Sequence, residues 1–190
     1  MSKTFTSKAL KALLVAGAVA FAVPAFAKGS VIVGGQEMFS TKTIVENAVN
    51  SADHTTLVAA VKAAGLVDTL MGKGPFTVFA PVNSAFNALP AGTVDTLLKP
   101  ENKGQLTGVL TYHVVAGRIT FADLKSWIKK GNGTAELKTV SGGRLWAMMN
   151  GPNNVILKDE TGNWSNVTTY DVMQSNGVIH SIDHVLLPKS

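Results

Sequence analysis

The chain has 190 residues, with 17 basic and 12 acidic side chains, four histidines and no cysteine. Without cysteine there is no disulfide, thiol catalyst, zinc ribbon or iron–sulfur ligand set, so an apolar core has to hold the fold together. The basic residues form no stripe of the kind that follows a phosphate backbone, so nucleic acid is not an expected partner.

The first 27 residues have the form of a secretory leader. Three lysines precede an apolar run over 12–23, and the small-x-small pattern at 25–27 is typical of a cleavage site, which we place between Ala27 and Lys28. A helix that spans a bilayer needs roughly 20 apolar residues, so a retained membrane anchor is the less favoured alternative. Loss of these three lysines leaves 14 basic and 12 acidic side chains. We expect a soluble protein in the periplasm or outside the cell, with no stable membrane insertion.

Residues 28–42 are mixed and interrupted by glycine, so they form an N-terminal lead-in and ordered structure is expected to begin at Thr43. Thr43 and Glu46 have the spacing of a capping box. In that motif a hydroxyl and a carboxylate bind backbone N–H groups that the first helical turn leaves free. A short helix is therefore predicted to about Asn50.

A second helix is predicted over 57–64, where apolar residues recur at helical spacing. Thr55 or Thr56 is its expected cap. Gly65 is expected to end it, because glycine adopts the left-handed conformation that other residues resist. One further helical turn follows over 66–71.

A buried strand is predicted over 76–80, because its residues are aromatic, β-branched or small and a proline follows them. Asn83 is the expected cap of the helix after this strand. Three short helices are predicted, at 83–89, 93–98 and 101–111.

The periodicity changes after Tyr112. A strand over 113–119 and a helix over 120–130 are followed by segments that alternate with turn residues. Five short strands are predicted there, at 136–140, 145–150, 155–158, 165–169 and 178–187. Because helices crowd the first half and strands the second, the fold class is α+β, with a single domain over 43–188.

Motifs of known catalytic sites are missing from the sequence. No serine lies in a GxSxG pattern, and Gly131-Asn132-Gly133 lacks the third glycine of a dinucleotide-binding loop. His113 has two interpretations: a buried imidazole hydrogen-bonded to a neighbour, which is favoured, or a general base near neutral pH. We expect no enzyme activity and no cofactor.

His180 and His184 would be about 13 Å apart in a strand, which is too far for two ligands of one metal ion, so no metal site is expected. Four acids could be imagined as a carboxylate pair for glycoside hydrolysis. They are Asp159, Glu160, Asp171 and Asp183. Because they lie beside turns, we favour their interpretation as solvated surface acids.

Three segments resemble the signatures of fasciclin-like domains: GPFTVFAPVNSAFNALP at 74–90, LTYHVVAGRIT at 110–120 and NGVIHSIDHVLLP at 176–188. The resemblance implies a wedge-shaped β-sandwich of about seven short strands flanked by several short helices. It also implies an exported or cell-surface protein that mediates adhesion. Tyr112 and His113 match the Tyr-His pair associated with adhesion in animal members. Val82 departs from the family, which often has threonine there, so Asn83 would cap its helix alone.

The favoured hypothesis is therefore an exported adhesion or interaction module without a chemical step. Its expected partner is a cell-surface or extracellular protein or polysaccharide, and we expect a monomer. The alternative is a carbohydrate or small-molecule binding protein in which Trp127 and Trp164 stack on the ligand. Trp146 alternates with Leu145 and Ala147 in a predicted strand, a position more typical of a core. A hydrolase that uses His113 or His180 with an acid from elsewhere in the chain is the third hypothesis.

Overall fold

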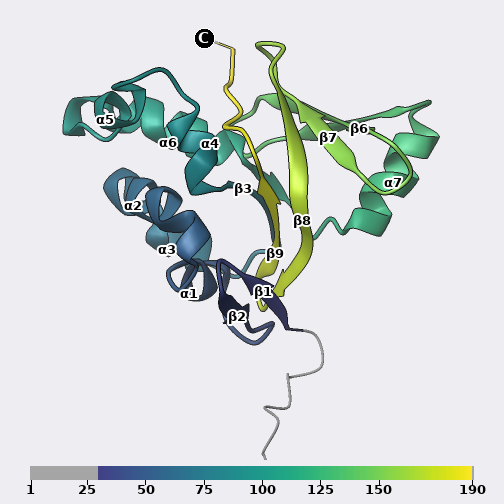
Figure 1. Cartoon of the computed structure of the whole chain (residues 1–190), viewed down its shortest axis with the longest axis horizontal. Coiled ribbons are helices and arrows are strands. Elements are labelled where there is room, and N and C mark those ends of the chain that lie inside the picture. The colour runs from purple at the N-terminus through teal and green to yellow at the C-terminus, as the bar shows by residue number, and fades with distance from the viewer. Residues whose placement is uncertain (1–29, 190) are drawn as a thin grey trace, which may run out of the picture.

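The computed structural model describes residues 30–189. The predicted leader, with its cleavage point between Ala27 and Lys28, lies outside these residues. The described strands form a two-stranded hairpin and a seven-stranded sheet in the order β4-β3-β9-β8-β7-β6-β5. Figure 1 shows helices α1 to α6 on one side of strands β3, β9 and β8 and helix α7 on the other. The predicted α+β class is confirmed.

The N-terminal hairpin was not predicted. Strands β1 (Val31–Val33) and β2 (Gln36–Met38) pair through Gly34 and Gly35, whose φ angles are 57° and 74°. Two consecutive positive φ angles are what a two-residue type I′ hairpin turn requires, and glycine adopts them without strain. Ordered structure therefore begins before Thr43. The sequence did not predict it because strands of three residues are too short to show an alternating pattern.

Most of the predicted helices are confirmed, although several are shorter than expected. The helices before Tyr112 are α1 (Ile44–Ala48), α2 (Thr55–Ala64), α3 (Val67–Met71), α4 (Asn83–Asn87), α5 (Thr93–Leu97) and α6 (Lys103–Tyr112), with 3-10 turns at Ala52–His54 and Pro100–Asn102. The Thr43–Glu46 capping box forms, with both side chain-to-backbone bonds present. Gly65 ends α2 with a φ of 70°, as predicted.

The predicted cap of α4 is wrong. Residue 82 occupies the N-cap position of α4 and forms no side-chain cap. The Asn83 Oδ1 atom instead accepts hydrogen bonds from Thr55 Oγ1 and from the Thr56 backbone N–H, both at 3.1 Å. Its Nδ2 donates to the Ala52 carbonyl at 2.8 Å. Asn83 thus caps α2, a partner almost 30 residues away that no local pattern could indicate.

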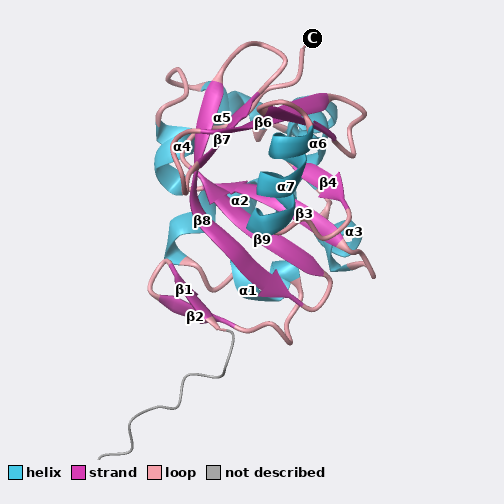
Figure 2. Ribbon diagram, turned by 90° about the vertical axis from the view of Figure 1, so that its right-hand side faces the viewer, coloured by secondary structure: helices cyan, strands magenta, loops and turns pink. Residues whose placement is uncertain are grey.

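The large sheet bends on its longest strand. The strands are β3 (Phe76–Pro81), β4 (Val114–Ala116), β5 (Thr134–Lys138), β6 (Arg144–Met149), β7 (Val155–Lys158), β8 (Trp164–Gln174) and β9 (Gly177–Ile182). Strand β8 is longer than predicted, and its register with β9 shifts twice near Asp171, where φ is 53°. Such bulges bend a strand and increase its twist. The sheet therefore folds over, and an isolated bridge joins Val115 of the edge strand β4 to Thr139, the residue after the other edge strand, β5. Figure 2 shows β8, β9, β3 and β4 side by side, with α7 in front of them.

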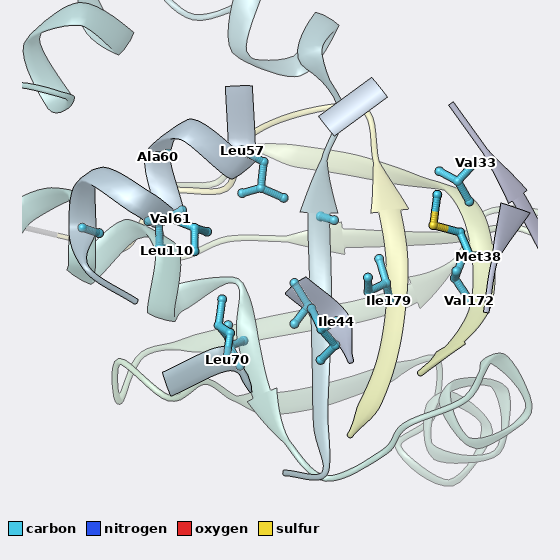
Figure 3. Close-up of a cluster of buried hydrophobic side chains, with 14 of the residues drawn as sticks. Val33, Met38, Ile44, Leu57, Ala60, Val61, Leu70, Leu110, Val172 and Ile179 are labelled. Carbon is cyan, nitrogen blue, oxygen red and sulfur yellow. The ribbon is translucent and has the colours of Figure 1, made fainter. Parts of the chain in front are cut away.

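Two main buried clusters lie on the two faces of the same strands. Val78 of β3 and Val114 of β4 belong to the first cluster. Figure 3 shows other members of this cluster, such as Leu57 and Ile179, between the helices and the strands. Phe79 and Val115, the next residues in β3 and β4, belong to the second cluster, enclosed by the folded sheet and helix α7 (Phe121–Lys130). Successive side chains of a strand point to opposite faces. Both faces of strand β3 are therefore buried, which explains why its sequence is almost entirely apolar.

Candidate functional site

Tyr112 is fully buried, so its side chain is not part of the accessible surface. Its hydroxyl donates to the Arg144 carbonyl at 2.6 Å and accepts from the Glu160 backbone N–H at 3.1 Å. Burial raises the pKa of Tyr112 to about 12. Gly143 has to be small here, because a Cβ atom would lie 2.7 Å from the Tyr112 ring. The two hydrogen bonds of the Tyr112 hydroxyl therefore link the start of β6 to the turn that follows β7.

His113 is a buried imidazole with both nitrogens engaged, which is the structural interpretation that the sequence favoured. Nδ1 lies 2.8 Å from the Val109 carbonyl, and Nε2 accepts from the Leu186 N–H at 3.0 Å. A carbonyl can only accept and a backbone N–H can only donate, so the proton is on Nδ1. Burial lowers the pKa of His113 to about 4, and the ring is neutral at pH 7. This geometry leaves no nitrogen free for a proton transfer at neutral pH.

The two histidines considered and rejected as metal ligands lie in different environments, one in the interior and one at the surface. His180 is fully buried in β9, and its Nε2 lies 2.8 Å from the Ile119 carbonyl. Burial lowers its pKa. His184 is exposed and its Nδ1 lies 2.9 Å from Asp183. Within residues 30–189, no group of three or more His, Cys, Asp or Glu side chains is arranged to hold a metal ion.

The acidic residues organise turns. Asp159 is 1% exposed, and its Oδ1 accepts from the backbone N–H groups of Thr161 and Asn163 at 2.9 and 2.8 Å. Its Oδ2 accepts from the Leu187 N–H at 2.9 Å. Asp171 Oδ1 accepts from the Phe121 N–H at 2.8 Å. The interpretation of these acids as merely solvated is therefore wrong for Asp159, whose carboxylate replaces water as the acceptor for three backbone donors.

Tryptophans lie in two separate places on the surface. Trp127 on α7 is 41% exposed and lines a shallow groove with Glu136, Lys138 and Val140, where the edges of β4 and β5 approach. Trp164 at the start of β8 is 44% exposed. The two predicted contact residues thus lie on different elements, α7 and β8.

Trp146 joins Trp164, although its position had indicated a core residue. Leu145 and Ala147 are fully buried, so the alternation of β6 turns Trp146 to the outer face of the sheet. The strand registers pair Trp146 with Lys158 and Lys158 with Trp164. The Lys158 Nζ atom lies 5.3 Å from the centre of the Trp164 ring, within the range of a cation–π interaction.

We call this outer surface the tryptophan face. It consists of the outward-pointing residues of β6, β7 and β8. They are Trp146, Met148, Ile156, Lys158, Trp164 and Asn166. Only Trp164 of this set was predicted as a contact residue. The other residues of this face show period-two alternation in the sequence. Such alternation indicates that the two faces of a strand differ, but it does not indicate which face is covered by the rest of the protein.

Comparison with known proteins places the chain in a family. The model of the Fasciclin domain matches residues 52–188. This chain belongs to the fasciclin domain family. It is 48% identical over 160 residues to "Protein sll1483" of Synechocystis sp., a match that covers 84% of this chain and 81% of that protein.

Two further matches are a relative named as a surface protein and a solved structure with the same fold. It is 37% identical over 123 residues to the "Cell surface glycolipoprotein MPB83" of Mycobacterium bovis, covering 65% of this chain and 48% of that one. Among solved structures, a FAS1 domain pair from the insect cell adhesion molecule Fasciclin I aligns with a TM-score of 0.67 at 20% identity. That alignment covers 77% of this chain and 51% of the insect chain. The predicted fasciclin-like fold is confirmed. Within residues 30–189, no helix is long and apolar enough to cross a membrane.

Proposed function

We propose that this fasciclin domain is an exported, non-catalytic adhesion module that binds a cell-surface or extracellular protein through its tryptophan face. The observation that carries the proposal is the exposed Trp164, which shares the outer face of the sheet with Trp146 and two further large apolar side chains that are each half-buried. Tryptophan is enriched among residues that dominate binding energy, and exposed apolar patches mark interaction sites. The relatives named as an adhesion molecule and a surface protein support the same role.

The buried Tyr112 and His113 enter this proposal as positioning residues. Tyr112 binds the backbone at Arg144, two residues before Trp146, and at Glu160, four residues before Trp164. It therefore links the start of β6 to the turn between β7 and β8, at one end of the tryptophan face. Loss of its hydroxyl in Tyr112→Phe is expected to weaken adhesion through the position of the two indoles, without removal of a contact atom.

The absence of a chemical step is part of the proposal. His113 and His180 each direct Nε2 or Nδ1 to backbone groups and have lowered pKa values. The buried carboxylate of Asp159 is similarly bound to backbone N–H groups. These side chains contribute to the fold, which supports a module that acts by binding.

A bead assay with two tryptophan variants tests the proposal. Beads coated with the exported protein are expected to attach to cells of the native source in a saturable manner, and the soluble protein is expected to compete. Trp164→Ala should lower attachment at least fivefold, whereas Trp127→Ala, a matched substitution of an equally exposed tryptophan, should not. Attachment that is absent, or that falls equally in both variants, would contradict the assignment of the tryptophan face.

Polysaccharide binding is the second candidate function. The row Trp146–Lys158–Trp164 spans three neighbouring strands, so the two indoles lie about 10 Å apart and could both stack on sugar rings. Protease treatment of the cells separates the two candidates. Attachment that survives protease and is lost after periodate oxidation of cell-surface sugars would favour the polysaccharide.

A further inference from the structure

An apolar cavity of about 230 Å³ lies inside the first buried cluster, between the helices and the sheet. Native interiors contain few voids larger than a water molecule. For comparison, an engineered apolar cavity of about 150 Å³ in another protein stays dry and binds benzene. The cavity is larger than that example, and the adhesion role does not use it, since none of the three tryptophans lines it.

The floor of the cavity is one row of β-branched side chains across four strands. The registers pair Val172 of β8 with Ile179 of β9, Ile179 with Val78 of β3, and Val78 with Val114 of β4. All four residues line the cavity. Neighbouring strands are about 4.8 Å apart, so the row is about 14 Å long. The site is therefore elongated, and an extended chain fits it better than a compact ring.

The roof is formed by helices, and some of the lining residues on α1 and α2 are exposed to solvent. Leu57 and Val61 of α2 and Ile44 of α1 point towards the strands (Figure 3). Val49 at the end of α1 also lines the cavity and is 47% exposed. Val58 of α2 is partly exposed and lies one helical turn before the exposed Lys62. These residues form the rim of the cavity.

The charge at the rim of the cavity is positive. Lys62 is the only charged side chain among the residues that line the cavity. Within residues 30–189, its ammonium group has no carboxylate within salt-bridge distance. A ligand with an apolar chain and an anionic head would bury the chain on the floor and place its head beside Lys62.

We propose that the cavity binds one single-chain amphiphile with a carboxylate head, a medium-chain fatty acid. The chain lies along the row from Val172 to Val114, and the carboxylate is paired with Lys62 at the rim. This site is separate from the tryptophan face, so its failure and the failure of the adhesion proposal are distinguishable.

Titration calorimetry with two matched ligands tests the proposal. Decanoate, below its micelle concentration, is expected to bind with a stoichiometry of one, and decan-1-ol is expected to bind about fivefold more weakly because it lacks the partly exposed ion pair. Lys62→Ala should lower decanoate affinity to that of decan-1-ol and leave decan-1-ol unchanged. Lys129→Ala, on the exposed side of α7, is the control and should bind both ligands as the parent does.

Nuclear magnetic resonance of methyl groups locates the ligand independently of any variant. A decanoate derivative with a nitroxide on its chain is expected to broaden the methyl signals of Val78 and Ile179, and to spare those of Leu145 and Leu157 in the second cluster. Val58→Trp, at the rim, should reduce binding at least tenfold.

Four results would overturn the proposal. They are no saturable decanoate binding by the folded parent, broadening centred on Leu145 and Leu157, wild-type binding by Val58→Trp, or equal affinity of both ligands that Lys62→Ala does not change. Tight binding of lyso-phosphatidylglycerol in place of decanoate would show that the ligand has a phospholipid head group and not a carboxylate. This result would also overturn the proposal. If Val58→Trp does not fold, the nitroxide experiment on the parent decides the location.

Discussion

The two main buried clusters use opposite faces of the same strands, yet they are packed differently. In the second cluster large side chains such as Tyr112, Leu145 and Leu157 are fully buried. In the first cluster Leu57 and Leu70 are 8% and 9% exposed and border the cavity. Continuous hydrogen-bonded strands wrap the second cluster, whereas helices of only five residues cover part of the first. Short helices offer few ridges to fill the grooves of a sheet, so this side retains space.

This difference suggests a division of roles between the two sides of the sheet. The closely packed cluster supports the strands whose outer surface is the tryptophan face. The loosely packed cluster holds the cavity in which we propose that the fatty acid binds. Four changes can break or sharpen this division.

The largest effect is expected from truncation of a leucine in the closely packed cluster. Leu145→Ala should lower the free energy of unfolding by about 4 kcal/mol, because the vacated space cannot be refilled, and Leu57→Ala by only about 2 kcal/mol, because one side of Leu57 already faces the cavity. Urea denaturation of both variants measures the two losses. Equal losses would show that the two clusters are packed alike in solution.

The next effect is expected at Asn176, which joins the helices to the sheet. Its Oδ1 accepts from the Ile44 N–H at 3.0 Å, and its Nδ2 donates to the carbonyls of Leu70 and Gly72 at 2.8 and 2.9 Å. Asn176→Ala leaves these buried groups without partners and should cost about 3 kcal/mol. Thermal unfolding measures the loss, with the exposed Asn153→Ala as control. A loss below about 1 kcal/mol would show that water replaces the amide.

The third change is the protonation of His113, a buried residue at the boundary between the two clusters. Burial lowers its folded pKa from 6.5 to about 4, so between these values the unfolded state binds more protons. Its contribution to stability is full above pH 6.5 and is lost as the pH falls towards 4. At 1.36 kcal/mol per unit this loss is about 3 kcal/mol.

The measurement is urea unfolding at pH 7 and pH 4.5 of the parent and of His113→Gln. The parent should lose about 2 to 3 kcal/mol more than the variant between these pH values, since other titrating groups act equally in both. His184→Gln, an exposed position, is the control. The same pH dependence in parent and His113→Gln would show that the ring is not held neutral.

The smallest effect compares one helix cap on each side of the sheet. Thr43 caps α1 over the first cluster and Thr120 caps α7 beside the second, each in a complete capping box. Thr43→Ala and Thr120→Ala should each cost about 1 kcal/mol, because a cap satisfies local backbone donors whatever the packing beneath it. Chemical denaturation checks both. A clear difference between the two losses would show that packing contributes to the strength of the caps.

The sequence alone determined the local features of this fasciclin domain. The capping box at Thr43, the helix end at Gly65, the buried strand β3 and the order of helices and strands all follow from residues within a few positions of one another. Their energies come from backbone donors and conformations that neighbouring side chains satisfy, which is why local patterns predict them. The exposed positions of Trp127 and Trp164, beside glycine turns, were predictable for the same reason.

Only the tertiary structure decided which distant groups meet. Asn83 caps α2 and not its own helix, because the fold brings Thr55 and Thr56 to it. Trp146 faces outward, because the folded sheet and α7 cover the opposite face. Tyr112, predicted as a contact residue, lies in the interior, and the cavity depends on the spacing of four separate strands from a helical roof. Such features depend on distances between segments far apart in the chain, and a single sequence does not encode them locally.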